Sequence, residues 1–99
     1  MPPMTKDEVK ARLQQHEGWE RDGDEIERKY TFAGFGEAVA FVNRVADLAD
    51  AADHHPDISI KYNRVKLTLS THSEGGVTEK DFALAARIDA AAPPTPEKK

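Results

Sequence analysis

The sequence contains no cysteine, which removes two kinds of stabilising chemistry at once. Neither a disulfide framework nor a cage of thiolates around a metal ion can form, and nothing favours an oxidising compartment. The sequence also lacks an apolar run of membrane-spanning length, and residues 1–7 lack the apolar core of a signal peptide. We therefore expect a cytoplasmic protein that does not enter a membrane.

Lysine and arginine form no basic stripe along the sequence, and the formal net charge is −4. Proteins that hold nucleic acid gather positive charge in order to neutralise phosphates. The sequence therefore predicts no direct binding to nucleic acid.

The chain has 99 residues, of which 38% are hydrophobic, and this is enough to bury one core. We expect a single domain over residues 1–92. Residues 93–99 are rich in proline and charged side chains, a composition that predicts a disordered tail.

The first part of the chain predicts a helix followed by a β-hairpin. Thr5 and Glu8 form a capping-box pattern, which starts a short helix that ends near His16. Residues 18–21 and 25–32 flank a short turn, and the second of these segments is apolar at alternate positions. Such alternation is typical of a strand with one buried face.

A longer helix is predicted over residues 36–51, where apolar side chains recur every three to four positions. A second hairpin follows, and the capping-box pattern of Thr78 and Asp81 then opens a last helix. The order of elements is helix, two strands, helix, two strands, helix. This order predicts an α+β domain in which three helices pack on one face of a four-stranded antiparallel sheet.

The second hairpin allows its pairing to be predicted, because a two-residue turn at Asn63 and Arg64 fixes the register. In this register the apolar side chains all face the core, and core packing is the role we expect for Tyr62. On the other face His55 lies opposite His72. The remaining predicted pairs are Tyr62 with Val65, Ile60 with Leu67, Ile58 with Leu69, Ser59 with Thr68 and Asp57 with Ser70.

Three of the four histidines, His54, His55 and His72, lie within 19 residues of one another. Imidazole titrates near neutral pH, so neighbouring histidines can deliver one proton and remove another. His54 and His55 taken alone could instead interact with the dipole of the preceding helix. The predicted register, which adds His72, favours a site for a small polar ligand.

Seven residues in this part of the chain follow a fixed spacing. The pattern is an acidic residue, three positions, His-His-Pro, five positions, an aromatic residue, nine positions, a histidine, and later an aspartate. The residues are Asp50, His54, His55, Pro56, Tyr62, His72 and Asp81. The pattern resembles the signature of the pterin-4a-carbinolamine dehydratases, and the resemblance extends from the region of Trp19 to Ala86.

The resemblance implies a lyase that removes water from 4a-hydroxytetrahydrobiopterin, the by-product of aromatic amino-acid hydroxylation, and yields quinonoid dihydrobiopterin for recycling. It also implies that His54 and His72 perform acid–base catalysis and that His55, in the same catalytic group, mainly holds the pterin. No metal and no organic cofactor is expected. The implied partners are the pterin, further copies of the chain in a homodimer or homotetramer, and a pathway link to an aromatic amino-acid hydroxylase.

The residues beside the histidines are expected to bind the substrate or to support the site. Asp57, Ser70 and Thr71 are our candidates for contact with the pterin, and Pro56 is a supporting residue.

Two aspartates have a structural interpretation as well as a functional one. Asp50 lies one helical turn before His54, and it either orients that imidazole or is simply solvated on the helix surface. Asp81 is three positions after Thr78, so we expect it mainly to cap the last helix and only indirectly to shape the site.

Two other classes of function fit some of the same residues. Exposed apolar positions on the predicted helix over residues 35–51 would suit a catalytically silent binding module, such as a dimerisation partner of transcription factors. A metal site made of His55, His72 and a carboxylate is disfavoured, because no fourth ligand is evident.

Overall fold

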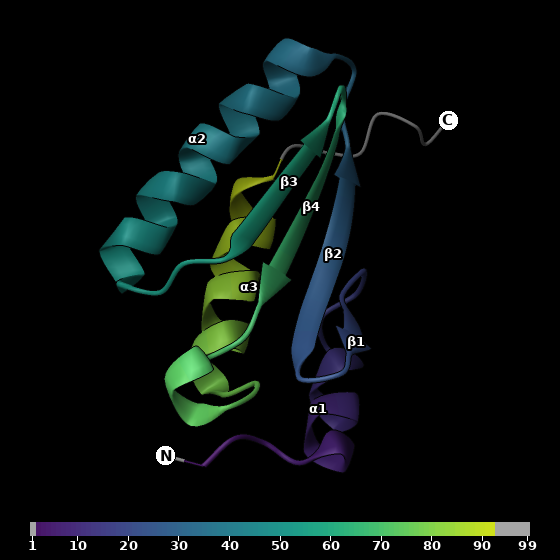
Figure 1. The fold of residues 1–99 in the computed structure, drawn as a ribbon. Coiled ribbons are helices and arrows are strands. Elements are labelled where there is room, and N and C mark those ends of the chain that lie inside the picture. The colour runs from purple at the N-terminus through teal and green to yellow at the C-terminus, as the bar shows by residue number, and fades with distance from the viewer. Residues whose placement is uncertain (1, 93–99) are drawn as a thin grey trace.

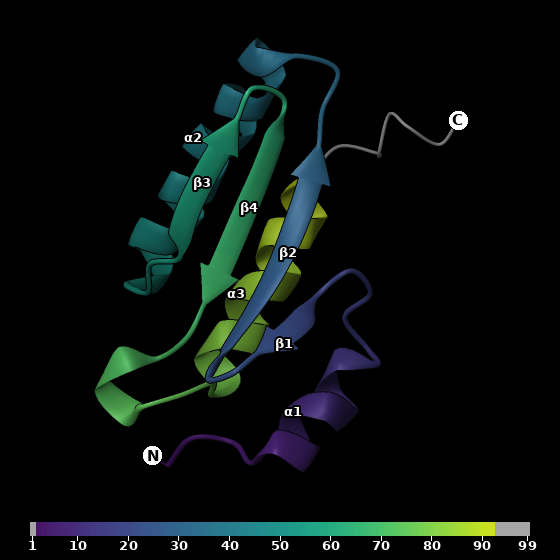
Figure 2. The same cartoon turned by 45° about the vertical axis from the view of Figure 1, so that its right-hand side comes forward.

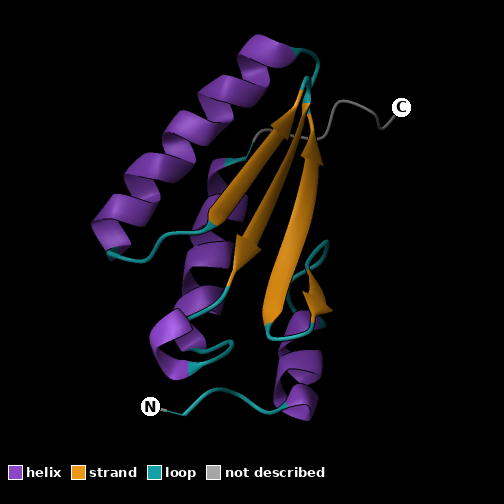
Figure 3. Ribbon diagram, in the orientation of Figure 1, coloured by secondary structure: helices purple, strands orange, loops and turns teal. Residues whose placement is uncertain are grey.

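The computed structural model describes residues 2–92, and the tail expected over residues 93–99 lies outside the described part. The helices and strands follow the predicted order, with one additional 3-10 helix (Figure 1; Figure 3). None of the helices in the described part is long and apolar enough to cross a membrane. The elements are α1 (Lys6–Leu13), β1 (Glu20–Asp22), β2 (Glu25–Thr31), α2 (Phe35–Ala52), β3 (Asp57–Lys61), β4 (Arg64–Leu69), η1 (His72–Glu74) and α3 (Glu79–Ala91).

The four strands form one antiparallel sheet in the order β1-β2-β4-β3. Each hairpin places its two strands side by side, and the hairpins meet along β2 and β4 (Figure 2). β3 is therefore an edge strand, and its partner β4 lies inside the sheet. The predicted α+β class and its order of elements are confirmed.

The core lies between one face of the sheet and the helices. Alternate residues of β2 and β4 point into it, as a strand with one buried face requires. Buried side chains from all three helices join the same cluster, so that the helices share one face of the sheet, as predicted. Its members from the strands include Ile26, Val65, Leu67 and Leu69, and those from the helices include Val9, Phe41, Val45, Phe82 and Ile88.

The pairing of β3 with β4 differs by two residues from the predicted register. The chain reverses at Tyr62 and Asn63, one position earlier than expected. A shift of two residues keeps each strand side chain on its predicted face, because successive side chains alternate. The observed pairs are Asp57 with Thr68, Ile58 with Leu67, Ser59 with Lys66, Ile60 with Val65 and Lys61 with Arg64.

The core role expected for Tyr62 is wrong. Tyr62 occupies the turn with a left-handed φ of 54°, and it is 68% exposed. The neighbouring Asn63 explains the position of the turn, because its Nδ2 donates to the carbonyl of Phe32 at 2.8 Å and its own carbonyl accepts from the Phe32 N–H at 2.9 Å. A contact with a residue distant in the sequence therefore fixes the turn.

A carboxylate on α3 connects this helix to β2 and to the segment before β1. Asp89 accepts hydrogen bonds from Trp19 Nε1 at 2.9 Å, from Arg28 Nη1 at 3.0 Å and from the Tyr30 hydroxyl at 2.6 Å. Trp19 and Tyr30 are buried, so Asp89 satisfies two donors that have little access to water.

Stability at alkaline pH is expected to depend on Tyr30. Burial raises the pKa of Tyr30 far above its ordinary value, and the hydrogen bond and the charge of Asp89 raise it further, whereas Arg28 lowers it. The unfolded chain releases this proton near pH 10, so the stabilising contribution is complete below about pH 10 and is lost as the pH rises above that value. We expect Tyr30→Phe to show a shallower decline in the free energy of unfolding above about pH 10, measured by urea denaturation.

The matched control is Tyr62→Phe, which removes a hydroxyl from an exposed ring. This variant should retain the alkaline slope of the wild-type protein. A slope in Tyr30→Phe equal to that of the wild type would contradict the prediction.

Candidate active site

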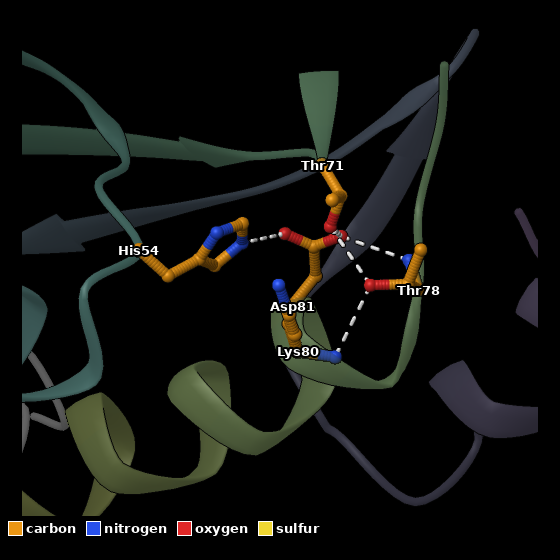
Figure 4. A network of polar contacts seen from close by, with 5 residues as sticks. All are labelled: His54, Thr71, Thr78, Lys80 and Asp81. Carbon is orange, nitrogen blue, oxygen red and sulfur yellow. Dashed lines mark hydrogen bonds and ion pairs between the residues drawn. The ribbon is translucent and has the colours of Figure 1, made fainter. Parts of the chain in front are cut away.

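His54 is placed by the end of α2. Asp53 caps the helix in a left-handed conformation with φ 52°, and the backbone N–H of His54 donates to the carbonyl of Ala49 at 3.1 Å. The chain thereby turns off the helix, and the His54 ring points toward the start of α3 (Figure 4).

Asp81 is fully buried in the first turn of α3 and is held there by a capping box. Its Oδ2 accepts from the backbone N–H of Thr78 at 2.9 Å and from the hydroxyl of Thr71 at 2.9 Å. The Thr71 proton is used in this bond, so the Thr78 hydroxyl donates to Thr71 Oγ1 at 2.8 Å. Thr78 Oγ1 in turn accepts from the backbone N–H of Lys80 at 3.2 Å, which completes the network in Figure 4.

The second oxygen of Asp81 binds His54. Its Oδ1 lies 2.5 Å from His54 Nε2, and the His54 side chain is only 12% exposed. A carboxylate only accepts hydrogen bonds, so it holds the proton of the imidazole on Nε2. Nδ1 of a neutral His54 is then the ring nitrogen that is free to accept a proton.

A cavity of about 300 Å³ opens beside this pair. The three clustered histidines line it, two from the segment after α2 and one from η1. The expected strand pairing of His55 with His72 does not form, because β4 ends before His72. This volume lies at the lower end of the range found for small-molecule sites. The lining residues are Asp53, His54, His55, Ser70, Thr71, His72, Ser73 and Lys80.

His55 has a different environment from His54. Its Nε2 lies 2.9 Å from Asp50 Oδ1, and both side chains are largely exposed. Asp50 therefore contacts His55, and the idea that Asp50 orients His54 is wrong. The carboxylate that orients His54 is Asp81, which combines this contact with its predicted capping role.

Comparison with known proteins identifies the family. The family model described as pterin 4 alpha carbinolamine dehydratase matches residues 2–91. The chain belongs to this family. Curated relatives named as candidate pterin-4-alpha-carbinolamine dehydratases include one from Thermomicrobium roseum, 58% identical over 80 residues, which are 81% of this chain and 86% of the relative. Another, from Chloroflexus aurantiacus, is 54% identical over 89 residues, which are 90% of this chain and 96% of the relative.

Solved structures agree with membership of the pterin 4 alpha carbinolamine dehydratase family. A crystal structure of a transcriptional coactivator/pterin dehydratase from Brucella melitensis matches with a TM-score of 0.87 and 38% identity, over 92% of this chain and 99% of that chain. A pterin dehydratase-like protein, described as a RuBisCO assembly factor in the alpha-carboxysome, matches with a TM-score of 0.64 and 28% identity, over 76% of this chain and 89% of that chain.

Four of the residues proposed for this dehydratase-family site lie outside the cavity lining, and two of them, Asp50 and Asp81, contact histidines that line it. Pro56 and Asp57 follow the histidines but do not line the cavity, and Asp57 pairs with Thr68 instead of the expected Ser70. Ser70 and Thr71 do line it.

Three lining residues were not anticipated from the sequence. Asp53 and Ser73 are adjacent to predicted histidines, and this proximity was the available signal. Lys80 reaches the cavity because α3 begins beside it, which no local sequence pattern reveals.

Within residues 2–92, no group of three or more histidine and acidic side chains has an arrangement that could hold a metal ion.

Proposed function

We propose that the protein catalyses the dehydration of pterin-4a-carbinolamine, 4a-hydroxytetrahydrobiopterin, to quinonoid dihydrobiopterin and water. The observation that carries this proposal is the pair formed by His54 and the buried Asp81 beside a cavity that two further histidines line. A positioned imidazole near a small polar cavity suits proton transfer to and from a bound substrate. Family membership supports the choice of a pterin as the substrate.

The reaction breaks the bond between the ring carbon and the hydroxyl oxygen. One proton must reach the leaving oxygen, which departs as water, and another must leave the pterin ring. We assign these transfers to His54 and His72, because both line the cavity and imidazole exchanges protons near neutral pH. His55, which is exposed and paired with Asp50, serves mainly to hold the pterin, together with Ser70 and Thr71.

The chemistry of the substrate suggests the place of the reaction in the cell. A carbinolamine of this kind arises when a tetrahydropterin supports the hydroxylation of an aromatic amino acid, and its dehydration allows the pterin to be recycled. We place this reaction in the cytoplasm, which suits a chain without cysteine.

The direct test is to measure dehydration by absorbance with the carbinolamine generated in situ by a hydroxylase. The wild-type protein should accelerate the decay over the spontaneous reaction in buffer. His16→Ala is the matched histidine control, since His16 packs against Phe82 and does not line the cavity. If the folded wild-type protein did not accelerate the decay, the proposed activity would be contradicted.

Self-association is expected because several large apolar side chains remain exposed. Phe35 at the start of α2 is 54% exposed, and Ile58 and Ile60 on the edge strand β3 are partly exposed. Exposed edge strands and apolar side chains are typical of surfaces that a second chain covers. We propose a homodimer or homotetramer, and light scattering after size exclusion should give a mass of at least twice 11.0 kDa. An 11.0 kDa species alone would contradict this proposal.

A protein-binding role is the second candidate function. One of the two similar structures is described as a transcriptional coactivator/pterin dehydratase and the other as a RuBisCO assembly factor, so the family's fold has been associated with protein partners as well as with catalysis. The same exposed residues would suit such a partner. A folded, self-associated protein without dehydration activity would favour this role over the enzymatic one.

A further inference from the structure

The sheet face opposite the helices carries a concentration of positive charge. Strand register places six side chains there in two neighbouring rows that cross β2, β4 and β3. Four of the six are cations, which we call the cationic face: Lys29, Lys61, Arg64 and Lys66. The rows are Lys29, Lys66 and Ser59, and next to them Thr31, Arg64 and Lys61.

These cations oppose one another directly across the strands. Lys29 is the register partner of Lys66, and Lys61 is the register partner of Arg64. Like charges in directly opposed positions destabilise a sheet. Local arrangements that cost stability in this way are often retained at functional sites.

Most of this charge is not neutralised within the protein. Lys66 Nζ lies 3.3 Å from Glu27 Oε1, but Lys29, Lys61 and Arg64 form no ion pair with any residue in the range 2–92. The local excess is notable because the whole chain has a net charge of −4. An anion from solution is therefore the natural counter-charge.

The cationic face is also hollowed. A cavity of about 430 Å³ lies over it, and the hydroxyls of Thr31 and Ser59 line this cavity together with the four cations. No acidic side chain is among the lining residues. Amine, guanidinium and hydroxyl donors together are the groups that bind phosphate oxygens.

The size of the cationic face favours a compact anion. Three strands span about 10 Å, and residues two apart on a strand are separated by about 7 Å. The next row contains Glu27 and Asp57, so negative charge borders the face on that side. A long nucleic acid would extend beyond the cations onto this acidic row, whereas a short chain of phosphates would not.

The cationic face is separate from the histidine cavity. The two cavities share no lining residue. Lys61 ends β3 and Arg64 begins β4, so the cations lie toward the turn that joins these strands. The histidine cavity is lined by residues that precede β3 or follow β4, at the other end of the hairpin. Figure 2 shows the two ends of this hairpin well apart.

We infer that the cationic face binds a compact oligophosphate, either an inorganic chain such as tripolyphosphate or the phosphate chain of a nucleoside triphosphate. Arg64 and Lys61 contact one part of the chain, Lys29 and Lys66 contact the other, and the two hydroxyls complete the set of donors. This site is distinct from the proposed dehydration site and does not depend on the dehydratase proposal.

The test is isothermal titration of the full chain at low ionic strength with tripolyphosphate, and in parallel with adenosine triphosphate. We expect saturable binding of both ligands with one site per chain, weakened by added salt. Lys61→Gln combined with Arg64→Gln should raise Kd by at least about tenfold, because two charged donors are lost. The dehydration rate of this variant should equal that of the wild type.

The matched control combines Lys10→Gln with Arg44→Gln, which removes the same charge from exposed positions on α1 and α2. An equal loss of affinity in this control would overturn the proposal, because binding would then follow net charge alone. Absence of saturable binding would overturn it too. The proposal would also be overturned if adenosine triphosphate bound and tripolyphosphate did not. It would be overturned equally if a single-stranded oligonucleotide bound much more tightly than either ligand, because the face would then recognise a different class of ligand.

Discussion

Replacing His54 with alanine is expected to lower the dehydration rate by about two to four orders of magnitude, which is the usual value of a positioned acid–base group. The reason is that Asp81 holds the proton of the ring on Nε2 and so leaves Nδ1 available for transfer. The fold should persist, because no member of the apolar core cluster is replaced. His72→Ala should show a similar loss, since it removes the second proposed proton carrier. The absorbance assay and thermal denaturation measure the two properties separately.

The role of Asp81 can be separated from that of His54. Asp81→Asn should lower kcat by at least about tenfold with a smaller effect on KM, because a misplaced imidazole still leaves the pterin contacts in place. Asp50→Asn is the matched control, since that carboxylate is exposed and contacts His55. Unchanged rates in both His54→Ala and His72→Ala would contradict the catalytic assignment, and equal kcat values in the two aspartate variants would contradict the positioning role of Asp81.

Replacing Asp89 with alanine is expected to lower the free energy of unfolding by about 2–4 kcal/mol. The substitution leaves the Trp19 indole N–H and the Tyr30 hydroxyl without their acceptor in a buried environment. An unsatisfied buried donor costs more than the net gain of the original hydrogen bond. The ion pair with Arg28 adds little to this value, because both side chains are about a quarter exposed. Urea denaturation followed by circular dichroism measures the change.

The control for this substitution is Asp47→Ala, which removes an exposed carboxylate from α2. Its free energy of unfolding should remain within about 0.5 kcal/mol of the wild-type value. If Asp89→Ala were equally mild, the hydrogen bonds of Asp89 would contribute little and the prediction would be wrong. Dehydration activity at a temperature where Asp89→Ala is folded should be retained, because Asp89 does not line the histidine cavity.

Much of the fold could be predicted because the signals are local. The capping box of Thr5 and Glu8 forms as expected, and the alternation in residues 25–32 buries Ile26 and Tyr30. The register of the second hairpin could not be predicted, because it depends on hydrogen bonds between Asn63 and Phe32. A left-handed conformation is uncommon for tyrosine, so the sequence of the hairpin does not indicate a turn at Tyr62. The contact that fixes this turn lies outside the hairpin.

The sequence predicts which residues gather at the candidate site, but not which carboxylate each histidine contacts. The spacing of the histidines and the family resemblance indicated which side chains gather, and His54, His55 and His72 do line one cavity. The partner of each histidine depends on how α2 ends relative to the start of α3. The left-handed Asp53 turns His54 toward Asp81 and leaves His55 beside Asp50. That choice between two carboxylates is made by tertiary packing.

The carboxylate of Asp81 makes the orientation of a reactive ring depend on the integrity of a helix start. Native proteins open locally in cooperative units that are smaller than the whole molecule. Transient fraying of α3 at Thr78 would therefore release His54 while the sheet remained intact. The Thr78 amide donates to Asp81, so its hydrogen-exchange rate reports how often this turn opens and the His54 ring is released. On gentle heating, activity would decline by reversible opening of one helical turn before the molecule as a whole unfolds.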